Sequence, residues 1–162
     1  MIISRTPVRV SFCGGGTDLP AYYADSENGG LVTSMALAKH IHVTVNKRFD
    51  SSVRVSYSKT EIVNDFEELE HELVREAMRI TGVTHSVEIT TIADIPSRGT
   101  GLGSSSALTV GLLNALHTFA GRNPDAAQLA DEACQIEIDI LGQPIGRQDQ
   151  YAAAFGGSNQ IA

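Results

Sequence analysis

The spacing of hydrophobic residues changes several times along the chain, which predicts a sheet combined with helices. In the first third, apolar residues alternate with polar ones, as they do in half-buried strands. The clearest example has Ile41, Val43 and Val45 separated by polar residues. The expected strands are residues 9–12, 31–37, 41–49 and 53–58. Four strands in succession predict an antiparallel meander.

The spacing becomes helical after residue 65. One apolar stripe repeats every three or four residues: Phe66, Leu69, Leu73, Ala77 and Ile80. Gly82 is expected to end this helix, and residues 86–92 return to a strand. A second buried stripe comprises Leu108, Leu112, Leu116 and Phe119, and a third, starting at Asn123-Pro124 and ending at Gly142, comprises Leu129, Ala133, Ile136 and Ile140. Strands followed by helices predict an α+β fold.

A glycine-rich turn joins the last predicted strand to the second predicted helix. Its residues after Pro96 and Ser97 are Arg98, Gly99, Thr100, Gly101, Leu102, Gly103, Ser104, Ser105 and Ser106. Alternate glycines allow positive φ angles and let a ligand approach the backbone. The start of the helix adds free N–H groups and a partial positive charge. We therefore expect this loop to bind a phosphate group, most simply that of a nucleotide.

Two common phosphate loops do not fit this turn. A P-loop requires Lys after its last glycine, whereas Ser104 follows Gly103. The dinucleotide fingerprint requires G-x-G-x-x-G, whereas this loop has G-x-G-x-G. The alternative without a ligand is a flexible surface loop with a serine N-cap.

The composition of the chain excludes several classes of protein. The 162 residues are 42% hydrophobic and contain no apolar run long enough for a membrane span, and the N-terminus lacks a signal peptide. The expected location is the cytoplasm. A net charge of −7 argues against nucleic acid as a partner. Cys13 and Cys134 are expected to be buried thiols, and His40 and His42 to be solvated, not metal-bound.

A second glycine cluster, Gly14, Gly15 and Gly16, precedes Thr17 and Asp18. Three glycines expose backbone donors, and the hydroxyl and carboxylate that follow suit a polyhydroxylated ligand. The alternative is a tight turn that Asp18 caps.

Two carboxylates near the end of the chain form the third candidate group. Glu137 and Asp149 are twelve positions apart, across a helix end and an expected loop. Glu137 follows Ile136 and is expected at the edge of the buried helix face. Mg²⁺ on nucleotide phosphates would give such an acid a partner. The alternatives are a helix-flank charge for Glu137 and an Asx turn for Asp149.

The three groups, in this order, resemble the N-terminal segments of the GHMP kinases, the superfamily of galactokinase, homoserine kinase, mevalonate kinase and phosphomevalonate kinase. Residues 6–10, 14–20 and 146–157 look like those of D-glycero-D-manno-heptose 7-phosphate kinases. The resemblance implies a two-layer α+β sandwich of a mixed, largely antiparallel sheet with helices. Residues 1–162 would form the ATP-binding, ribosomal-protein-like N-terminal domain. The family's C-terminal domain is expected to be absent, which would leave this piece inactive alone.

The resemblance also implies roles for single residues. The loop 98–106 would wrap the ATP phosphates, and Ser105 and Glu137 would hold Mg²⁺. Asp149 stands where these kinases have their catalytic aspartate, and Arg9 where they keep a basic residue beside it. The sugar or sugar phosphate would contact residues 14–18 and Gln148.

The implied reaction is transfer of the ATP γ-phosphoryl group to a sugar hydroxyl, the anomeric one of D-glycero-D-manno-heptose 7-phosphate in the narrower assignment. Gly15-Gly16 replaces the Glu-His of galactokinases and leaves room for a phosphorylated sugar. Three alternatives remain open: another GHMP sugar kinase of galactokinase or fucokinase type, a superfamily decarboxylase, and a non-catalytic sensor of sugars or nucleotides.

Overall fold

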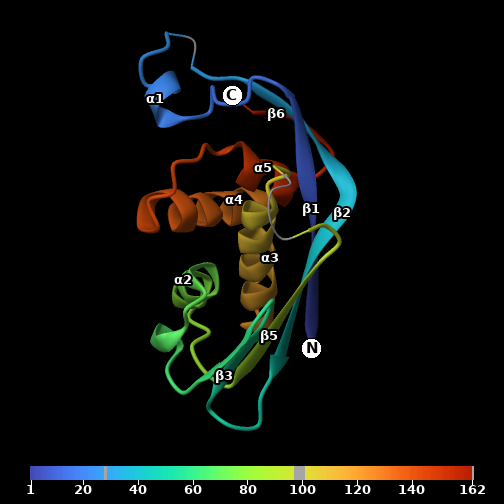
Figure 1. The fold of residues 1–162 in the computed structure, drawn as a ribbon, viewed down its shortest axis with the longest axis vertical. Coiled ribbons are helices and arrows are strands. Elements are labelled where there is room, and N and C mark those ends of the chain that lie inside the picture. The colour runs from blue at the N-terminus through green and yellow to red at the C-terminus, as the bar shows by residue number, and fades with distance from the viewer. Residues whose placement is uncertain (28, 97–100, 162) are drawn as a thin grey trace.

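The computed structural model describes residues 1–27, 29–96 and 101–161, and it confirms the α+β class. Six strands form one sheet in this part of the chain, and the helices pack against one of its faces (Figure 1). The strands are β1 (Ile2–Cys13), β2 (Val32–Lys47), β3 (Val53–Ser56), β4 (Thr60–Val63), β5 (Val87–Ala93) and β6 (Ser158–Ile161). Their order is β1-β2-β5-β3-β4, and β6 pairs with the beginning of β2.

Helix α3 lies at the centre of the helical layer. The helices are α1 (Pro20–Tyr23), α2 (Glu72–Thr81), α3 (Ser104–Phe119), α4 (Ala126–Cys134) and α5 (Gln148–Phe155). A 3₁₀ turn, η1 (Phe66–Glu68), precedes α2, and a π-helical segment, η2 (Gln135–Ile140), continues α4. Helix α3 packs on β1 and β2 and also touches α2, α4 and α5, so its apolar residues form the middle of the core.

Strand β2 is one strand of 16 residues, where the sequence predicted two. Its buried residues are even-numbered at Val32 and Ser34 but odd-numbered from Ile41 to Val45. The change coincides with an irregular register opposite residues 7–9 of β1. The break in alternation is therefore a bulge and does not separate two strands. The predicted antiparallel meander holds for β1 and β2 but is wrong at β3, because β5 lies between β2 and β3 and pairs parallel with β3. The mixed, largely antiparallel sheet is confirmed.

The remaining differences concern the ends of elements and three elements that the pattern did not predict. The first helical stripe is divided between η1 and α2, and Gly82 ends α2 as expected, with φ of 68°. Helix α4 begins after Asp125, whose side chain accepts a hydrogen bond from Gln128 N at 2.8 Å. The pattern predicted neither β4, β6 nor α5.

The burial of several single residues also differs from the prediction. Ile140 is 46% exposed, because the π-helical turn rotates it away from the core. Cys13 is exposed, whereas Cys134 is buried as predicted, and burial raises the pKa of its thiol to about 12. His40 and His42 are half-buried, and their rings lie 3.6 and 3.3 Å from Asp94 oxygens.

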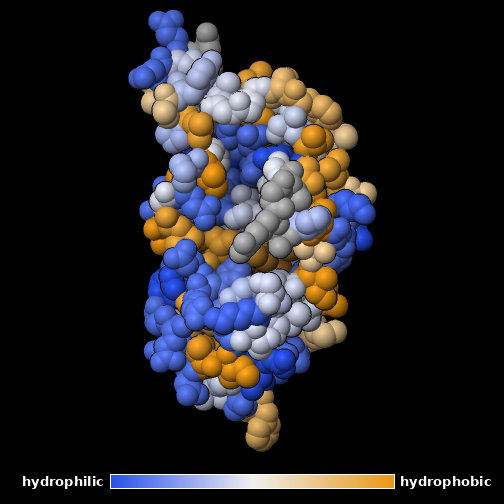
Figure 2. Space-filling view, viewed as in Figure 1, coloured by the Kyte–Doolittle hydropathy of each residue, from blue (hydrophilic) through white to orange (hydrophobic). Residues whose placement is uncertain are grey.

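The outer face of the sheet is partly apolar. Figure 2 shows apolar side chains along the upper right margin, over β1 and β2 of Figure 1. Exposed residues of these strands include Phe12 and Met35. None of the helices in the described ranges is both long enough and apolar enough to cross a membrane.

Gly111 allows α3 to lie close to the sheet. A Cβ at this position would stand 2.8 Å from Thr6 Oγ1 and 3.3 Å from Val43 Cγ2. Gly111→Val should lower the free energy of unfolding by about 1–3 kcal/mol, since overpacking outweighs a helix-propensity gain of about 0.4 kcal/mol. Chemical denaturation measures the change. The control Thr118→Val, on the exposed side of α3, should stay within about 0.5 kcal/mol, and equal effects of the two variants would contradict the packing argument.

Candidate active site

The irregular pairing of β1 with β2 turns Arg9 toward the helices. Ser4, Thr6 and Val8 are buried beneath the helical layer, so strict alternation would place Arg9 on the outer face. The register of β1 against β2 shifts between Pro7 and Arg9. As a result Val8 and Arg9 both face inward, and the side chain of Arg9 is only 14% exposed.

Arg9 forms an ion pair with Asp149 in the first turn of α5. Its Nε and Nη2 atoms lie 2.7 and 2.6 Å from Asp149 Oδ1. Oδ2 accepts no hydrogen bond from the described residues. It lies beside Gly103, where a Cβ would be only 3.0 Å away. The structure therefore joins Arg9 and Asp149, and leaves one carboxylate oxygen available to a ligand.

Burial raises the pKa of Asp149 above its ordinary value. The positive charge and hydrogen bond of Arg9 oppose this shift, and the nearby Asp18 carboxylate adds to it. A carboxylate with a raised pKa accepts protons more readily than an exposed one, which is the property that a general base requires.

Arg9 also holds the glycine-rich loop in place. Its Nη1 donates to Gly101 O at 2.8 Å, and its backbone N donates to Leu102 O at 3.1 Å. Gly101 and Gly103 have positive φ angles of 62° and 69°. Arg98, Gly99 and Thr100, which we also predicted to contact phosphate, lie outside the described residues.

Gly103, not a serine, is the N-cap of α3. The first helical hydrogen bond runs from Ala107 N to Gly103 O at 3.0 Å. The backbone amides of Ser104, Ser105 and Ser106 thus have no acceptor within the helix, and three N–H groups face the loop. This confirms the strand, loop and helix order that the sequence predicted, and it provides the donors that an anion needs.

Glu137 is completely buried, whereas the sequence placed it at the edge of the buried face. The π-helical segment explains the difference, because the wider turn brings Ile136 and Glu137 to the core together. Oε1 accepts hydrogen bonds from Ser105 Oγ at 2.8 Å and Thr109 Oγ1 at 3.2 Å. Oε2 accepts from Ser106 Oγ at 2.8 Å and Gln150 Nε2 at 2.5 Å. The partner of the carboxylate is therefore a set of hydroxyl and amide donors.

The same group has the chemistry of a Mg²⁺ site. The exposed Ser105 hydroxyl adjoins Glu137 Oε1 at the start of α3, and Mg²⁺ prefers such oxygen ligands. Gln150 Oε1 is buried without a hydrogen-bond partner among the described residues. Within the described ranges, no group of three or more His, Cys, Asp or Glu residues is placed so that it could hold a metal ion.

Asp18 fastens the second glycine cluster to the start of α5. Its Oδ2 accepts from Gln148 N at 3.0 Å and its Oδ1 from Gly16 N at 3.1 Å. Gly146 lies directly against this carboxylate, since a Cβ there would be 1.9 Å from Oδ2. Thr17 is similarly engaged, and its Oγ1 accepts from Leu31 N at 3.0 Å. The side chains of Thr17 and Asp18 therefore hold the loop of the second glycine cluster in its conformation.

A small cavity of about 220 Å³ lies beside the ion pair. Its walls include Arg9, Gly16, Asp18, Gln148 and Asp149. Residues of the second glycine cluster and Asp149 of the third predicted group thus line one cavity. Gln148 also accepts a hydrogen bond from Ser11 Oγ at 2.5 Å, a contact that the sequence analysis did not anticipate.

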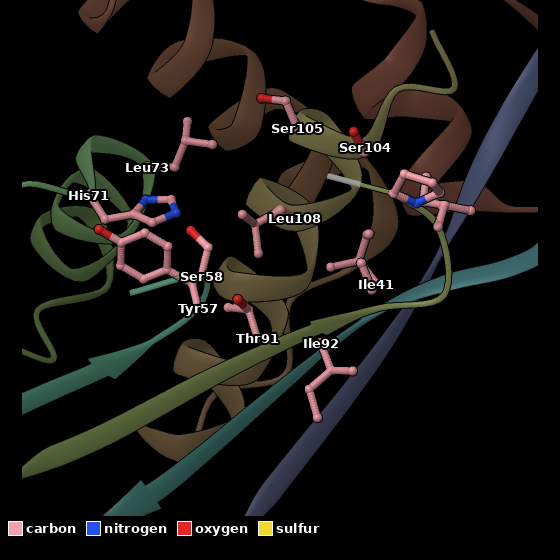
Figure 3. Close-up of a pocket in the computed structure, with 13 residues that line it drawn as sticks. Ile41, Tyr57, Ser58, His71, Leu73, Thr91, Ile92, Ser104, Ser105 and Leu108 are labelled. Carbon is pink, nitrogen blue, oxygen red and sulfur yellow. The ribbon is translucent and has the colours of Figure 1, made fainter. Parts of the chain in front are cut away.

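A larger cavity of about 510 Å³ adjoins the first turn of α3. Figure 3 shows the Tyr57 and His71 rings together on one side of it, with Leu108 and Ser105 of α3 across from them. The two rings meet edge to face with centroids 4.7 Å apart. Burial lowers the pKa of His71, which favours a neutral imidazole. Isolated aromatic residues in a strand and a loop gave no sequence signal for this cavity.

Comparisons with known proteins agree with this geometry. The family model described as the GHMP kinases N terminal domain matches residues 58–157, more than half of the chain. A D-glycero-alpha-D-manno-heptose 7-phosphate kinase of Campylobacter jejuni is 35% identical over 98% of this chain and 49% of its own. A galactokinase of Thermotoga maritima is 27% identical over 94% of this chain and 43% of its own.

The solved structures give the same result. The crystal structure of a D-glycero-D-manno-heptose 1-phosphate kinase from Bacteroides thetaiotaomicron superposes with a TM-score of 0.89 and 28% identity. The match covers 99% of this chain and 55% of that one. The chain thus spans about half the length of these relatives. Because the family model matches more than half of the chain and a heptose 7-phosphate kinase is 35% identical over 98% of it, this chain belongs to the GHMP kinase family.

Proposed function

We propose that this chain is the ATP-binding part of a sugar kinase that transfers the γ-phosphoryl group of ATP to a sugar hydroxyl. The narrower substrate is D-glycero-D-manno-heptose 7-phosphate, and the acceptor is its anomeric hydroxyl. The observation that carries the proposal is the half-buried ion pair of Arg9 and Asp149 beside the loop that opens α3. The relative named as a heptose 7-phosphate kinase supports the choice of sugar.

In this proposal the nucleotide spans two neighbouring features. The amides of the first turn of α3 and the loop bind the phosphates. The adenine base of ATP enters the cavity beside Tyr57, His71 and Leu108, whose aromatic and apolar walls suit a flat ring. Ser104 and Ser105 lie on the border of this cavity, so base and phosphates are contiguous.

The acceptor hydroxyl occupies the small cavity next to Asp149. Oδ2 accepts its proton as the oxygen attacks phosphorus, while Arg9 keeps Oδ1 fixed and offsets negative charge nearby. Ser105 and Glu137 would hold Mg²⁺, which neutralises charge on the nucleotide phosphates. Positioning and charge compensation thereby supply most of the catalysis.

The first prediction separates a base from a structural residue. Asp149→Asn, in the protein at its full natural length, should lower kcat by about 10²- to 10⁴-fold, because the amide accepts no proton. The KM for ATP should stay near its original value, since the phosphates bind the loop. Steady-state kinetics with the heptose 7-phosphate provide the measurement.

The matched control is Asp139→Asn at an exposed position, which should leave kcat unchanged. A kcat of Asp149→Asn within a few-fold of the parent would make Asp149 a turn residue. A raised KM for ATP alone would instead associate it with the metal.

The second prediction concerns the charge of Asp149. Its carboxylate should titrate above the ordinary aspartate pKa of about 3.9, because burial disfavours the ionised form. Arg9→Gln should raise this pKa further, because it removes the positive charge and the hydrogen bond that lower it. Carboxylate ¹³C NMR of the two proteins measures both values, and Asp149→Asn assigns the resonance. A fall on removing Arg9 would refute this account of the pair.

The third prediction tests the loop by calorimetry of nucleotide binding to the chain. Gly101→Val should weaken Mg-ATP binding at least about tenfold, because valine strains a backbone at positive φ. Ser105→Ala should weaken binding of Mg-ATP but not of ATP in EDTA, because it removes a metal ligand.

The control is Gly121→Val, which places equal strain at φ of 79° beyond the end of α3. It should leave nucleotide affinity unchanged. Circular dichroism verifies that each variant is folded. Unaltered affinity in both loop variants would contradict the assignment of the phosphate site.

A further inference from the structure

A third cavity, of about 510 Å³, lies on the other side of Asp18. It is formed by the segment around α1, the beginning of α5 and the last strand, which come together at the top of the molecule in Figure 1. Its walls include Asp18, Tyr23, Gly30, Arg147 and Tyr151. The nucleotide and the ion pair do not account for this space.

Asp18 and Arg147 are the two formally charged residues among the described walls of this cavity. The Asp18 carboxylate is occupied by the backbone amides of Gly16 and Gln148. Tyr151 donates its hydroxyl to Asp131 at 2.5 Å, and that bond raises the phenol pKa to about 12, so the ring carries no charge. Arg147 forms no ion pair with any residue that the structure describes. Its positive charge is the one that remains for a ligand.

The chain around Arg147 separates this cavity from the small one. Gly146 and Gln148 line the small cavity beside Asp149, while Arg147 between them lines the large one. Asp18 lines both. A ligand with a hydroxyl at Asp149 that extends past Asp18 therefore has its far end beside Arg147.

We propose that Arg147 binds the phosphate group of a sugar phosphate substrate and so selects phosphorylated over unphosphorylated sugars. This inference rests on the proposed function. In a heptose 7-phosphate, the anomeric hydroxyl and the phosphate are at opposite ends of the carbon chain, as the two cavities require. A guanidinium suits this task, because its planar set of N–H donors matches phosphate oxygens.

The test compares two substrates, D-glycero-D-manno-heptose 7-phosphate and the same heptose without phosphate. Arg147→Gln should raise the KM for the sugar phosphate by about 10- to 100-fold, the value of hydrogen bonds to a charged group. The KM values for the plain heptose and for ATP should not change. Arg147→Lys, which keeps the charge but loses the planar donors, should recover part of the affinity.

Arg5→Gln provides the control for charge alone, because Arg5 is exposed on β1 and lines none of the three cavities. It should leave every KM unchanged. An equal rise for both sugars in Arg147→Gln would overturn the inference and leave the proposed function intact. Unchanged kinetics in Arg147→Gln would also overturn the inference.

Binding of the two sugars, measured by calorimetry without ATP, separates this inference from the reaction itself. If the parent protein turns over neither sugar but binds the phosphate ester more tightly, and Arg147→Gln removes that preference, the proposed function fails and the anion site stands. If the parent shows no preference for the ester, the anion site is refuted.

Discussion

The ion pair between Arg9 and Asp149 is the contact on which the arrangement of this site depends. Arg9 is held on β1, Asp149 is held 140 residues later on α5, and the glycine-rich loop is attached to the same guanidinium through Gly101 O. A charged group so far removed from water needs opposite charge and hydrogen bonds. The pair meets this need while leaving Asp149 Oδ2 without a protein donor in the described part of the chain.

A second buried charge fixes the opposite side of the loop. Glu137 receives four hydrogen bonds, three of them from hydroxyls of α3. These contacts fix α3 against the π-helical segment, and the segment in turn gives Glu137 its inward direction. The site therefore combines a carboxylate whose oxygens are both hydrogen-bonded with one that has an open oxygen, and the free amides of α3 lie at the start of the helix that carries the donors.

Asp18 connects the parts of the site that would meet the acceptor. It joins the glycine cluster after β1 to the first turn of α5, and Gly146 permits this approach because it has no side chain. The small cavity, the large cavity with Arg147 and the ion pair are all arranged around this one carboxylate. The proposed function requires such a division, because one end of the substrate would react while the other end is recognised.

Local chemistry explains what the sequence by itself determined. Several features depend only on residues that are close together in the sequence. They are the glycine- and serine-rich loop, the end of α2 at Gly82 and the apolar stripes of α2 and α3. The α+β class and the loop between strand and helix were predictable for that reason. The loop, together with the motifs around Asp18 and Asp149, also indicates the family that the family model confirms.

Contacts between distant segments decided the rest. The alternation of β2 changes phase because it bulges against β1, so the sequence alone predicted two strands. Three other features likewise require a partner from elsewhere in the chain. They are the inward direction of Arg9, the full burial of Glu137 and the parallel pairing of β3 with β5. Periodicity reports which face of an element is apolar, but only tertiary packing determines which element covers it and where a strand or helix must deform to admit a polar side chain.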